Sequence, residues 1–510
     1  MNQGNTTPSL HNRYRQRCQT LAEGCPGLVC LGPDTLPVGL TADSRQVAPG
    51  SLFAALSGTH SDGRRFIDQA LERGAVAILD DGTWRPDPAV ADRVCRLVHA
   101  EPRLALSWLA AAFLGHPARG MRHVGITGTN GKTTVAAMVE AILSRAGERV
   151  GVMGTTGHRW PGMQRTSSMT TPDPLTLQSL LQEMQTAGCT TSVMEVSSHA
   201  LDQQRVASLR FDAGAFLNLT RDHLDYHGSE EAYFAAKSRL FQAGQSLRGV
   251  INGDDPRGAA VMRLCQASGM PFSTFASDRG GRGDFQAEAL TMTWQGTRFQ
   301  MVTPAGTGAI HLPVAGYFNV ANALAAAALA SQMGIPLEVV RAGLADFTPP
   351  AGRMQVVDRG QPFAVVVDFA HTPDALERLL ITARQLTPGR LIAVFGCGGE
   401  RDRTKRAMMG CISARLADVS IVTDDNPRHE DPAAIRRSIL EGAAGMAEGR
   451  TCLEIAGRDM AIARAISLAS AGDAVLLAGK GHETNQIMAD RVLPFDDAEV
   501  ARHQLDRLIA

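Results

Sequence analysis

The sequence predicts an α/β protein with three domains, and two observations support this fold class. The chain has 510 residues, and at roughly 150 residues per domain this length indicates about three units, each with its own core. Short apolar runs alternate with helical segments, which is typical of parallel sheets with crossover helices. We expect a small N-terminal α/β domain over residues 1–104, a central parallel-sheet domain over 105–346 and a C-terminal Rossmann-like, doubly wound domain over 347–510.

The N-terminal domain is predicted from two strand-like runs and one helical segment. The apolar runs lie at residues 52–56 and 75–79, and the helical pattern covers 66–73. Alternation of this kind over a short stretch is typical of a small α/β unit. Residues 1–25 are polar and contain several arginines, so we expect a loose arm there.

The two larger domains repeat this alternation over longer stretches. Short apolar runs bounded by turn residues are consistent with buried parallel strands. In the central domain the expected strands lie at residues 124–127, 192–196, 213–217 and 249–252. In the C-terminal domain they lie at 363–367, 391–395, 419–423 and 474–478, with a helix at 432–447.

The composition excludes several classes of protein. Lys and Arg number 50, Asp and Glu number 51, and the formal net charge is −1, with 44% hydrophobic residues. These values are typical of a globular protein and exclude disordered, collagenous and coiled-coil chains. A charge near zero provides no basic surface for nucleic acid or an anionic membrane. Any phosphate must therefore be bound locally.

Cysteine use and hydropathy indicate the compartment. The nine cysteines are scattered and contain no CxxC pair, so neither a disulfide framework nor a zinc site is predicted. The N-terminus lacks an apolar signal core, and the longest apolar stretch, residues 104–114, is shorter than the roughly 20 residues that a membrane span needs. We expect a cytoplasmic monomer that binds small molecules.

A phosphate-binding loop is predicted at residues 124–134, with the sequence VGITGTNGKTT. An apolar strand precedes its glycines and a helical pattern follows them, which is the context that a P-loop ATPase requires. Lys132 would meet the β- and γ-phosphates, and the Thr133 hydroxyl would bind Mg²⁺. The first glycine of the usual pattern is replaced by Ile126. The loop residues expected at ATP are Gly128, Thr129, Asn130, Gly131, Lys132, Thr133 and Thr134.

Two further segments place acids and histidines at strand ends of the same sheet. Glu195 ends the strand at 192–196, where a carboxylate can bind Mg²⁺ directly or through water. The segment 218–227 contains two His and two Asp after the strand at 213–217. His223 is therefore a candidate metal or phosphate ligand. A solvated acid and a structural histidine remain the alternatives.

Together these motifs resemble those of the Mur ligases. The matching segments are TGTNGKTT at 127–134, EVSSH at 195–199, RDHLDYH at 221–227 and GYFNVAN at 316–322. Others follow in family order, including DSR at 43–45, DFAHTPD at 368–374, DNPR at 425–428 and GKGHE at 479–483. The resemblance implies an ADP-forming amide ligase of peptidoglycan synthesis. It would join a diamino acid to UDP-N-acetylmuramoyl-L-alanyl-D-glutamate through an acyl phosphate.

The resemblance also implies the metal site and the catalytic residues. Mg²⁺ would be held by Thr133, Glu195, His223 and a carbamylated Lys237, and Lys132 would complete the catalytic set. From the sequence alone, Lys237 in the helical run 231–241 would be taken as a solvated lysine. Carbamylation would turn a cation that repels Mg²⁺ into an oxygen ligand.

Further residues are implied at the two nucleotide-containing substrates. Asn319 and Asn322, three residues apart on one helical face, would contact ATP. Arg353 and Asp368 would reach the nucleotide from the third domain, so that domain closure completes the site. For the UDP-sugar peptide the implied residues are Ser44, Thr170, Thr171, Ser197, Gln203 and Arg205.

The added amino acid is predicted to be meso-diaminopimelate. Its distal carboxylate suits the planar fork of Arg428, with Arg401 as a second candidate, whereas lysine has no such carboxylate. In the family the Asp-Asn-Pro-Arg form accompanies diaminopimelate. The remaining residues expected here, of which the acids and the amide would accept from the ammonium group, are Asp425, Asn426, Gly479 and Glu483.

Some features depart from the family or fit another pattern. Glu400 stands where Asp is common and Phe369 where Tyr is usual. The glycine-rich segment at 479–483 contains Lys480 but no Ser or Thr after a GK pair, so we do not interpret it as a second phosphate loop.

Three alternative functions remain. Within the enzymes these are an L-lysine-adding ligase and a folylpolyglutamate synthetase, against which the Asp-Asn-Pro-Arg motif and the first-domain match argue. From another class, the chain could be a nucleotide-dependent binding module without catalysis. Retention of Lys132, Glu195, His223 and Lys237 argues against that class.

Overall fold

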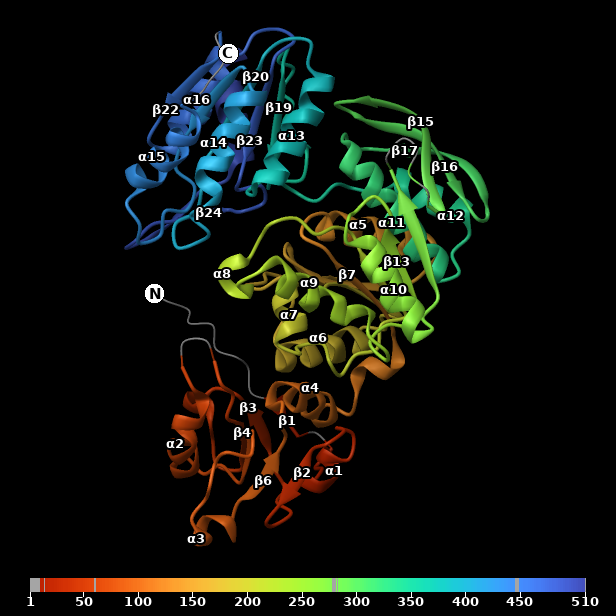
Figure 1. The fold of residues 1–510 in the computed structure, drawn as a ribbon, viewed down its shortest axis with the longest axis vertical. Coiled ribbons are helices and arrows are strands. Elements are labelled where there is room, and N and C mark those ends of the chain that lie inside the picture. The colour runs from red at the N-terminus through yellow and green to blue at the C-terminus, as the bar shows by residue number, and fades with distance from the viewer. Residues whose placement is uncertain are drawn as a thin grey trace.

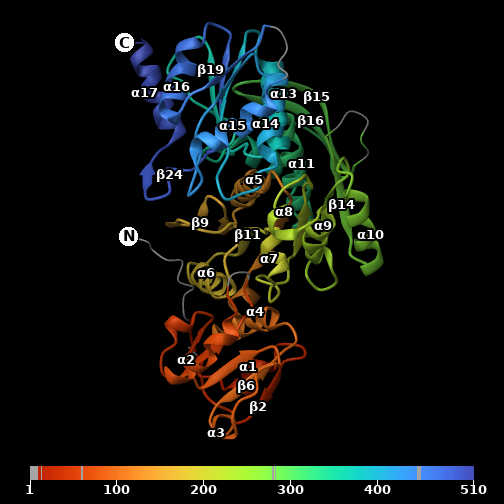
Figure 2. The same ribbon diagram turned by 60° about the vertical axis from the view of Figure 1, so that its left-hand side comes forward.

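The computed structural model describes residues 10–12, 14–58, 61–277, 281, 283–444 and 449–509. Three α/β domains are stacked along the long axis, with the N-terminal domain at one end and the C-terminal domain at the other (Figures 1 and 2). Each domain is built on a sheet whose central strands are parallel. The predicted α/β class with three domains is therefore confirmed.

The first sheet has the order β1-β3-β4-β5-β6-β2. Strands β3 to β6 are parallel, and β1 and β2 are antiparallel strands at the two edges. The strands are β1 (Leu10–His11), β2 (Val29–Leu31), β3 (Gly39–Thr41), β4 (Ser51–Ala54), β5 (Ala77–Asp80) and β6 (Cys95–Val98). The helices are α1 (Cys18–Ala22), η1 (Ser44–Gln46), η2 (Gly63–Phe66), α2 (Ile67–Glu72), α3 (Pro88–Ala91) and α4 (Pro102–Phe113).

The expectation of a loose arm before residue 26 is wrong for the described residues 10–12 and 14–25. Leu10 pairs with Leu40 in the sheet, and α1 buries Cys18 and Leu21 in the core of this domain. The polar composition concealed this arrangement because the few apolar residues that reach the core are separated by polar ones. Residues 1–9 of the expected arm lie outside the described residues.

Helix α4 connects the first domain to the second. Its buried residues from Ala105 to Phe113 belong to the core of the first sheet, which also includes Leu175 of the central domain. The predicted boundary between residues 104 and 105 thus falls inside α4, and the boundary between 346 and 347 falls in the segment before β18.

The central sheet has the order β10-β9-β8-β11-β7-β12-β13-β14-β15-β16-β17. It is parallel from β8 to β15, and antiparallel hairpins extend it at both edges. The strands are β7 (Arg122–Thr127), β8 (Val150–Gly154), β9 (Gly157–Trp160), β10 (Met163–Arg165), β11 (Thr191–Glu195), β12 (Ala213–Phe216), β13 (Gly249–Asn252), β14 (Phe272–Ala276), β15 (Phe285–Thr293), β16 (Gly296–Thr303) and β17 (Gly306–Leu312). The helices are α5 (Lys132–Arg145), α6 (Pro174–Thr186), α7 (Ser198–Asp202), α8 (Leu224–His227), α9 (Glu230–Ser238), α10 (Gly258–Ser268), α11 (Tyr317–Gln332) and α12 (Leu337–Ala345), with 3₁₀ turns η3 (Pro117–Gly120) and η4 (Arg239–Phe241).

The position of β7 explains where a ligand can bind. Strand β7 lies between β11 and β12, in register with both, so that Glu195 pairs with Ile126 and Phe216 pairs with Thr127. In such sheets, ligands bind beyond the carboxyl ends of the strands at the point where the strand order reverses. The loops after β7, β11 and β12 therefore meet at one place.

The third sheet has the order β18-β19-β23-β20-β21-β22 and is parallel except for β18. The strands are β18 (Gln355–Val356), β19 (Ala364–Asp368), β20 (Leu391–Phe395), β21 (Val419–Val422), β22 (Thr451–Glu454) and β23 (Ala474–Ala478), with a separate hairpin of β24 (Asn485–Ile487) and β25 (Val492–Pro494). The helices are α13 (Pro373–Leu386), α14 (Lys405–Leu416), α15 (Pro432–Gly442), α16 (Arg458–Leu468) and α17 (Asp497–Ile509). The predicted helix at 432–447 ends earlier, at Gly442, and residues 445–447 lie outside the described part.

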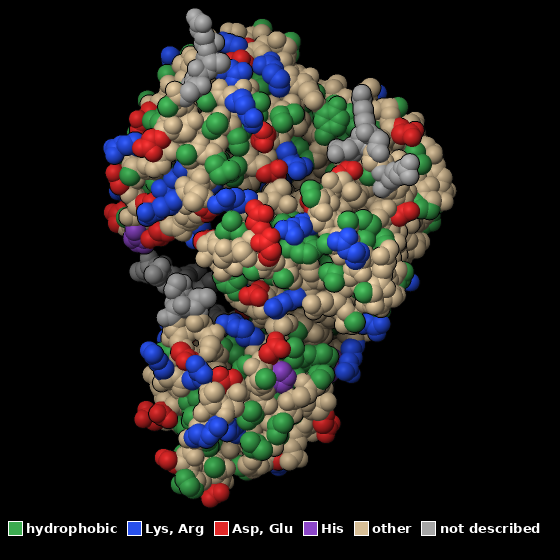
Figure 3. All heavy atoms as spheres, viewed as in Figure 1, with side chains coloured by type: hydrophobic (Ala, Val, Ile, Leu, Met, Phe, Trp, Pro, Cys, Tyr) green, Lys and Arg blue, Asp and Glu red, His purple; other side chains and the backbone are tan. Residues whose placement is uncertain are grey.

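Surface properties agree with the composition. Acidic and basic side chains are interspersed over the face shown in Figure 3. All nine cysteines are free thiols. Among the helices that the structure describes, none combines the length and apolarity needed to cross a bilayer.

The packing of α1 can be tested with Leu21→Ala. Leu21 is 1% exposed, and truncation of a buried leucine costs about 2–5 kcal/mol. We expect a lower midpoint of urea unfolding, followed by tryptophan fluorescence, since Trp84 and Trp108 lie in this domain. Thr20→Ala, at an exposed position of the same helix, should leave the midpoint unchanged. Equal midpoints for both variants would contradict the assignment of α1 to the core.

Candidate active site

The loop between β7 and α5 is shaped for close contact with phosphate. Gly128 and Gly131 have φ angles of +157° and +91°. A Cβ atom on Gly131 would lie 2.4 Å from Oδ1 of Asn322, so only glycine fits there. The N-terminus of α5, where unpaired N–H groups favour an anion, follows directly. The predicted strand, loop and helix are all present.

Glu195 is held rigidly beside this loop. It is 1% exposed at the end of β11. Its Oε2 accepts from the hydroxyls of Thr133 and Thr155, both at 3.0 Å, and its Oε1 accepts from the Thr155 N–H at 2.9 Å. The hydroxyl predicted to bind Mg²⁺ and the predicted carboxylate are thus brought together.

Two lysine side chains converge on the carbonyl oxygen of Gly128. Lys132 donates to it at 2.8 Å and Lys237 at 2.9 Å, the latter from helix α9. Lys237 is 1% exposed, unlike a solvated helix lysine. Burial, and secondly the charge of Lys132, hold the pKa of Lys237 well below its ordinary value. Burial also lowers the pKa of Lys132.

His223 lies at the edge of this site rather than inside it. Its side chain is 46% exposed, in the left-handed backbone region with φ of +54°, and its Nε2 is 3.5 Å from Asp222 Oδ2. The ring stacks edge-on to His199, with centroids 4.9 Å apart. Among the described residues, no three His, Cys, Asp or Glu side chains gather closely enough to hold a metal. A metal ion at this site would therefore need oxygen ligands in addition to these side chains.

A cavity of about 450 Å³ adjoins the loop and extends between the central and C-terminal domains. It contains four side chains that were predicted at the nucleotide, and three residues of the phosphate loop. These are Asn319, Asn322, Arg353 and Asp368, together with Asn130, Gly131 and Thr134. The structure thus brings segments from distant parts of the sequence to one cavity.

Several residues that line this cavity also contact one another or a neighbouring ring. Asn322 donates to the Asn319 side-chain oxygen at 3.1 Å, and Arg353 lies over the Phe369 ring at 4.6 Å. Phe369 therefore offers Arg353 an aromatic face without the hydroxyl of a tyrosine. Burial raises the pKa of Asp368, and the nearby Arg353 opposes that rise.

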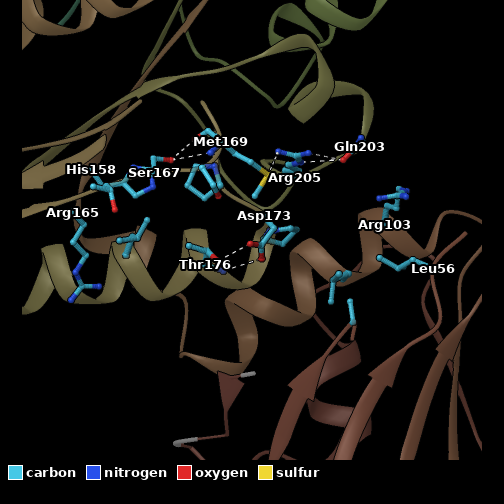
Figure 4. A pocket seen from close by; sticks show the side chains of 17 residues that line it. Leu56, Arg103, His158, Arg165, Ser167, Met169, Asp173, Thr176, Gln203 and Arg205 are labelled. Carbon is cyan, nitrogen blue, oxygen red and sulfur yellow. Dashed lines mark hydrogen bonds between the residues drawn. The ribbon is translucent and has the colours of Figure 1, made fainter. Parts of the chain in front are cut away.

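A second cavity of about 480 Å³ lies between the first and central domains (Figure 4). Gln203 and Arg205 line it, and Arg205 donates to the Gln203 side-chain oxygen and, at 2.8 Å, to the Thr171 carbonyl. The Thr171 hydroxyl bonds to the Glu195 carbonyl and lies 3.3 Å from Ser197 Oγ. A chain of contacts thus connects this cavity to the phosphate loop.

Two other residues predicted at the UDP-sugar peptide, Thr170 and Ser44, are not among those that line this cavity. Thr170 lies 3.0 Å from the hydroxyl of Thr155, the residue that contacts Glu195. Ser44 lies in η1 of the first domain and is 9% exposed.

The loop after β21 forms a third group. Asn426 donates to Glu483 Oε2 at 2.7 Å, and Asp425 is 7% exposed. Arg428 donates to the Gly399 carbonyl at 2.7 Å and has a φ of +52°. Gly479 approaches this loop closely, since a Cβ atom on it would lie 3.3 Å from Asp425 Oδ2.

The two arginines of this region differ in their surroundings. Burial, and secondly the charge of Arg401, lowers the pKa of Arg428. Arg401 is exposed and donates to the Glu400 carbonyl. Glu400 itself pairs with His429 at 3.0 Å.

Direct contacts connect the third domain to the phosphate loop. Asn130 donates to Asp374 of α13 at 3.1 Å, and Arg353 donates to the Thr133 hydroxyl at 3.3 Å. In this structure the third domain therefore contacts the phosphate loop directly.

Sequence reasoning missed several residues of these sites. Thr155 follows the apolar run of β8. The glycines on either side of it, Gly154 and Gly157, were the sequence feature that could have marked this position. Asp255 follows β13 in a similar way, and its carboxylate accepts from the Leu219 N–H at 2.9 Å beside the nucleotide cavity. Arg103, at the start of α4, lines the second cavity, and no local pattern distinguished it.

The arrangement is that of a ligase with a nucleotide site between domains, and the comparisons agree. Models of the Mur ligase family match the catalytic domain at residues 38–114, the middle domain at 126–330 and the glutamate ligase domain at 352–481. The chain belongs to the Mur ligase family of ATP-dependent ligases.

Individual relatives are similar to this chain over nearly its whole length. The UDP-N-acetylmuramoyl-L-alanyl-D-glutamate--2,6-diaminopimelate ligase of Thermosynechococcus vestitus is 45% identical over 91% of this chain and 92% of its own. That of Geobacillus thermodenitrificans is 43% identical over 95% and 98%. A solved structure with the same enzyme name is 34% identical, with a TM-score of 0.68 over 92% of this chain and 95% of its own. MurF of Thermotoga maritima in complex with ADP shares the fold, at 19% identity and a TM-score of 0.61 over 92% and 97%.

His371 provides a test of burial between the domains. Burial, and secondly the cation of Lys405, lowers its pKa to about 4. The unfolded histidine takes up a proton near its ordinary pKa of about 6.5, so stability is lost as pH falls from about 6.5 towards 4. Between pH 7 and pH 5 we expect the wild type to lose roughly 2 kcal/mol more than His371→Gln.

Urea unfolding at the two pH values measures this difference. His503→Gln, at an exposed position of α17, serves as the control and should follow the wild type. A pH dependence that is the same in the wild type and in His371→Gln would refute the expectation.

Proposed function

We propose that this protein adds meso-diaminopimelate to the side-chain carboxylate of the D-glutamyl residue in UDP-N-acetylmuramoyl-L-alanyl-D-glutamate, with ATP converted to ADP and phosphate. The observation that carries the proposal is that the third domain contacts the phosphate loop through Arg353 and also contains the Arg428 loop, where we place the amino acid. The curated relatives described above have names that state the same substrates. The reaction belongs to peptidoglycan precursor synthesis.

ATP would occupy the cavity between the central and third domains. The backbone N–H groups of the loop and the Lys132 ammonium group would bind the phosphate oxygens. Asn319 and Asn322 would contact the base and ribose. Arg353, which already contacts Thr133, would add positive charge from the third domain.

The residues present fit Mg²⁺ in part before any ligand is added. Thr133 and Glu195 provide a hydroxyl and a buried carboxylate 3.0 Å apart, and both are oxygen donors of the kind that Mg²⁺ prefers. His223 and Lys237 would hold a second ion only after Lys237 becomes a carbamate. When bound, Mg²⁺ supplies positive charge that neutralises phosphate oxygens.

Burial, and secondly the charge of Lys132, lower the pKa of Lys237, and this favours the neutral amine that carbamylation requires. The nitrogen lone pair would attack the carbon of CO₂, a C–N bond would form, and one proton would leave the nitrogen to water. The product is an anion, which the neighbouring Lys132 stabilises. The carbamate would thereby form an ion pair with Lys132.

The proposed reaction brings together two anions, the glutamate carboxylate and the γ-phosphate of ATP. A glutamate carboxylate oxygen attacks the γ-phosphorus of ATP, the bond to ADP breaks, and an acyl phosphate forms. The amine of the incoming amino acid then attacks the acyl carbon, loses a proton, and phosphate leaves. Lys132 would lower the repulsion between carboxylate and phosphate, and Arg205 would hold a carboxylate or phosphate of the peptide substrate.

The choice of amino acid would depend on the third domain. Arg428, with Arg401 nearby, suits the distal carboxylate of diaminopimelate. Asp425 and Glu483 would accept from its ammonium group.

Amino-acid selectivity gives the first test of this proposal. With ATP, Mg²⁺ and the UDP-muramoyl dipeptide, phosphate release and the tripeptide mass are expected with meso-diaminopimelate and not with L-lysine. Arg428→Lys should lower kcat/KM for diaminopimelate by roughly 10- to 100-fold, because the bidentate contact is lost. Turnover with lysine alone would sink the amino-acid assignment, and release with neither would favour a binding module.

The carbamate gives a second test. Incubation in CO₂-depleted buffer should lower the activity of the wild type, and added bicarbonate should restore it. Lys237→Ala should lose at least about 100-fold in kcat, since loss of electrostatic stabilisation at the transferred group typically costs that much. Bicarbonate should not rescue this variant. Full activity of Lys237→Ala would show that the lysine carries no catalytic modification.

A further inference from the structure

Lys480, in the glycine-rich segment that is not a phosphate loop, is completely buried. It follows β23, and its ammonium group makes three contacts. It donates to Asn426 Oδ1 at 3.1 Å, to Glu483 Oε2 at 3.0 Å and to the Asn485 carbonyl at 2.7 Å. An ammonium group has three hydrogens, so all its donors are used within the amino-acid pocket.

These contacts fix which way the Asn426 amide points. Its Oδ1 accepts from Lys480 and also from the Ile487 N–H at 2.9 Å. Its Nδ2 therefore faces Glu483 Oε2, to which it donates at 2.7 Å. An amide nitrogen has two hydrogens, so one hydrogen remains beyond the bond to Glu483 among the contacts of the described residues.

Lys480 also offsets negative charge in the pocket. Its ammonium group lies 3.8 Å from Asp425 Oδ1, a buried oxygen without a hydrogen-bond partner among the described residues. Burial raises the pKa of Asp425, and the cations of Arg458 and Lys480 oppose that rise. Arg458 is itself paired with Asp497, both fully buried. Among the residues that the structure describes, Lys480 is the cation with an ion pair to both Asp425 and Glu483.

We propose that Lys480 is a positioning residue for the amino-acid substrate. It orients the Asn426 amide and the Glu483 carboxylate so that the pocket offers an N–H group to a carboxylate and carboxylate oxygens to one ammonium group. It also offsets part of the negative charge of Asp425 and Glu483, and loss of this cation would favour a substrate with a bare cationic side chain over a zwitterionic one. This inference rests on the proposed function.

The test compares Lys480→Met with Lys480→Gln, using the full-length chain. Steady-state kinetics are measured with meso-diaminopimelate and with L-lysine, and separately with ATP varied. In Lys480→Met we expect KM for diaminopimelate to rise at least 10-fold while KM for ATP stays within about twofold. The ratio of kcat/KM for diaminopimelate to that for lysine should fall at least fivefold.

Lys480→Gln separates hydrogen bonding from charge. Its amide can still donate to Asn426 Oδ1, so KM for diaminopimelate should lie between those of the wild type and Lys480→Met. Arg390→Met is the control, because Arg390 pairs with Asp473 before β23, at the opposite end of the same strand. Its KM values should equal those of the wild type. If Lys480→Met does not fold, the same comparison is made with Lys480→Gln.

Several results would overturn the inference. These are an equal rise in KM for ATP and diaminopimelate, or an unchanged preference between the two amino acids, in a folded variant. A purely structural role predicts the first of these. Failure of the wild type to use diaminopimelate would instead overturn the proposed function and this inference with it, so the two failures are distinguishable.

Discussion

Two lysine side chains that share the carbonyl oxygen of Gly128 set the constraint on which the rest of the site depends. Lys132 and Lys237 come from different helices and approach this oxygen to 2.8 and 2.9 Å. Like charges in a buried loop are unfavourable unless anions compensate for them. The loop therefore favours phosphate, carboxylate or carbamate groups, and Glu195 already supplies one negative charge nearby.

The parallel sheet holds these groups in place. Strand β7 lies between β11 and β12, and the register brings Glu195 level with Ile126. Helix α5 starts directly after the loop, and Gly154 leaves room for the Glu195 carboxylate, since a Cβ atom there would lie 2.1 Å from Oε1. Small residues at close approaches thus allow the phosphate loop and the Glu195 carboxylate to lie side by side in a rigid arrangement.

The third domain contacts this site and also contains the loop proposed to bind the amino acid. Arg353 and Asp374 contact the phosphate loop, and the same domain contains the pocket of Asn426, Arg428 and Glu483. An acyl phosphate is sensitive to water, so a reaction that passes through one benefits from closure of a domain over it. In the proposed reaction, the domain that brings the amine would also cover the nucleotide.

Local features of the sequence determined the fold class, the phosphate loop and the order of the domains. Apolar runs, glycines and helix starts act over a few residues, and the strands at 249–252, 391–395 and 474–478 match the predicted bounds. The roles of Lys237, Arg205 and Arg428 came from a resemblance to a family and not from spacing. They stay predictions, although the structure buries Lys237 as that reading requires.

Tertiary structure alone decided what depends on contacts between distant segments. The inclusion of Leu10 and Leu21 in the first core and the participation of Arg103 and Thr155 had no periodic signal. The burial of Lys480 among Asn426 and Glu483 is another such case. A charged residue is buried only when partners far away in the chain surround it, and composition and spacing do not contain that information.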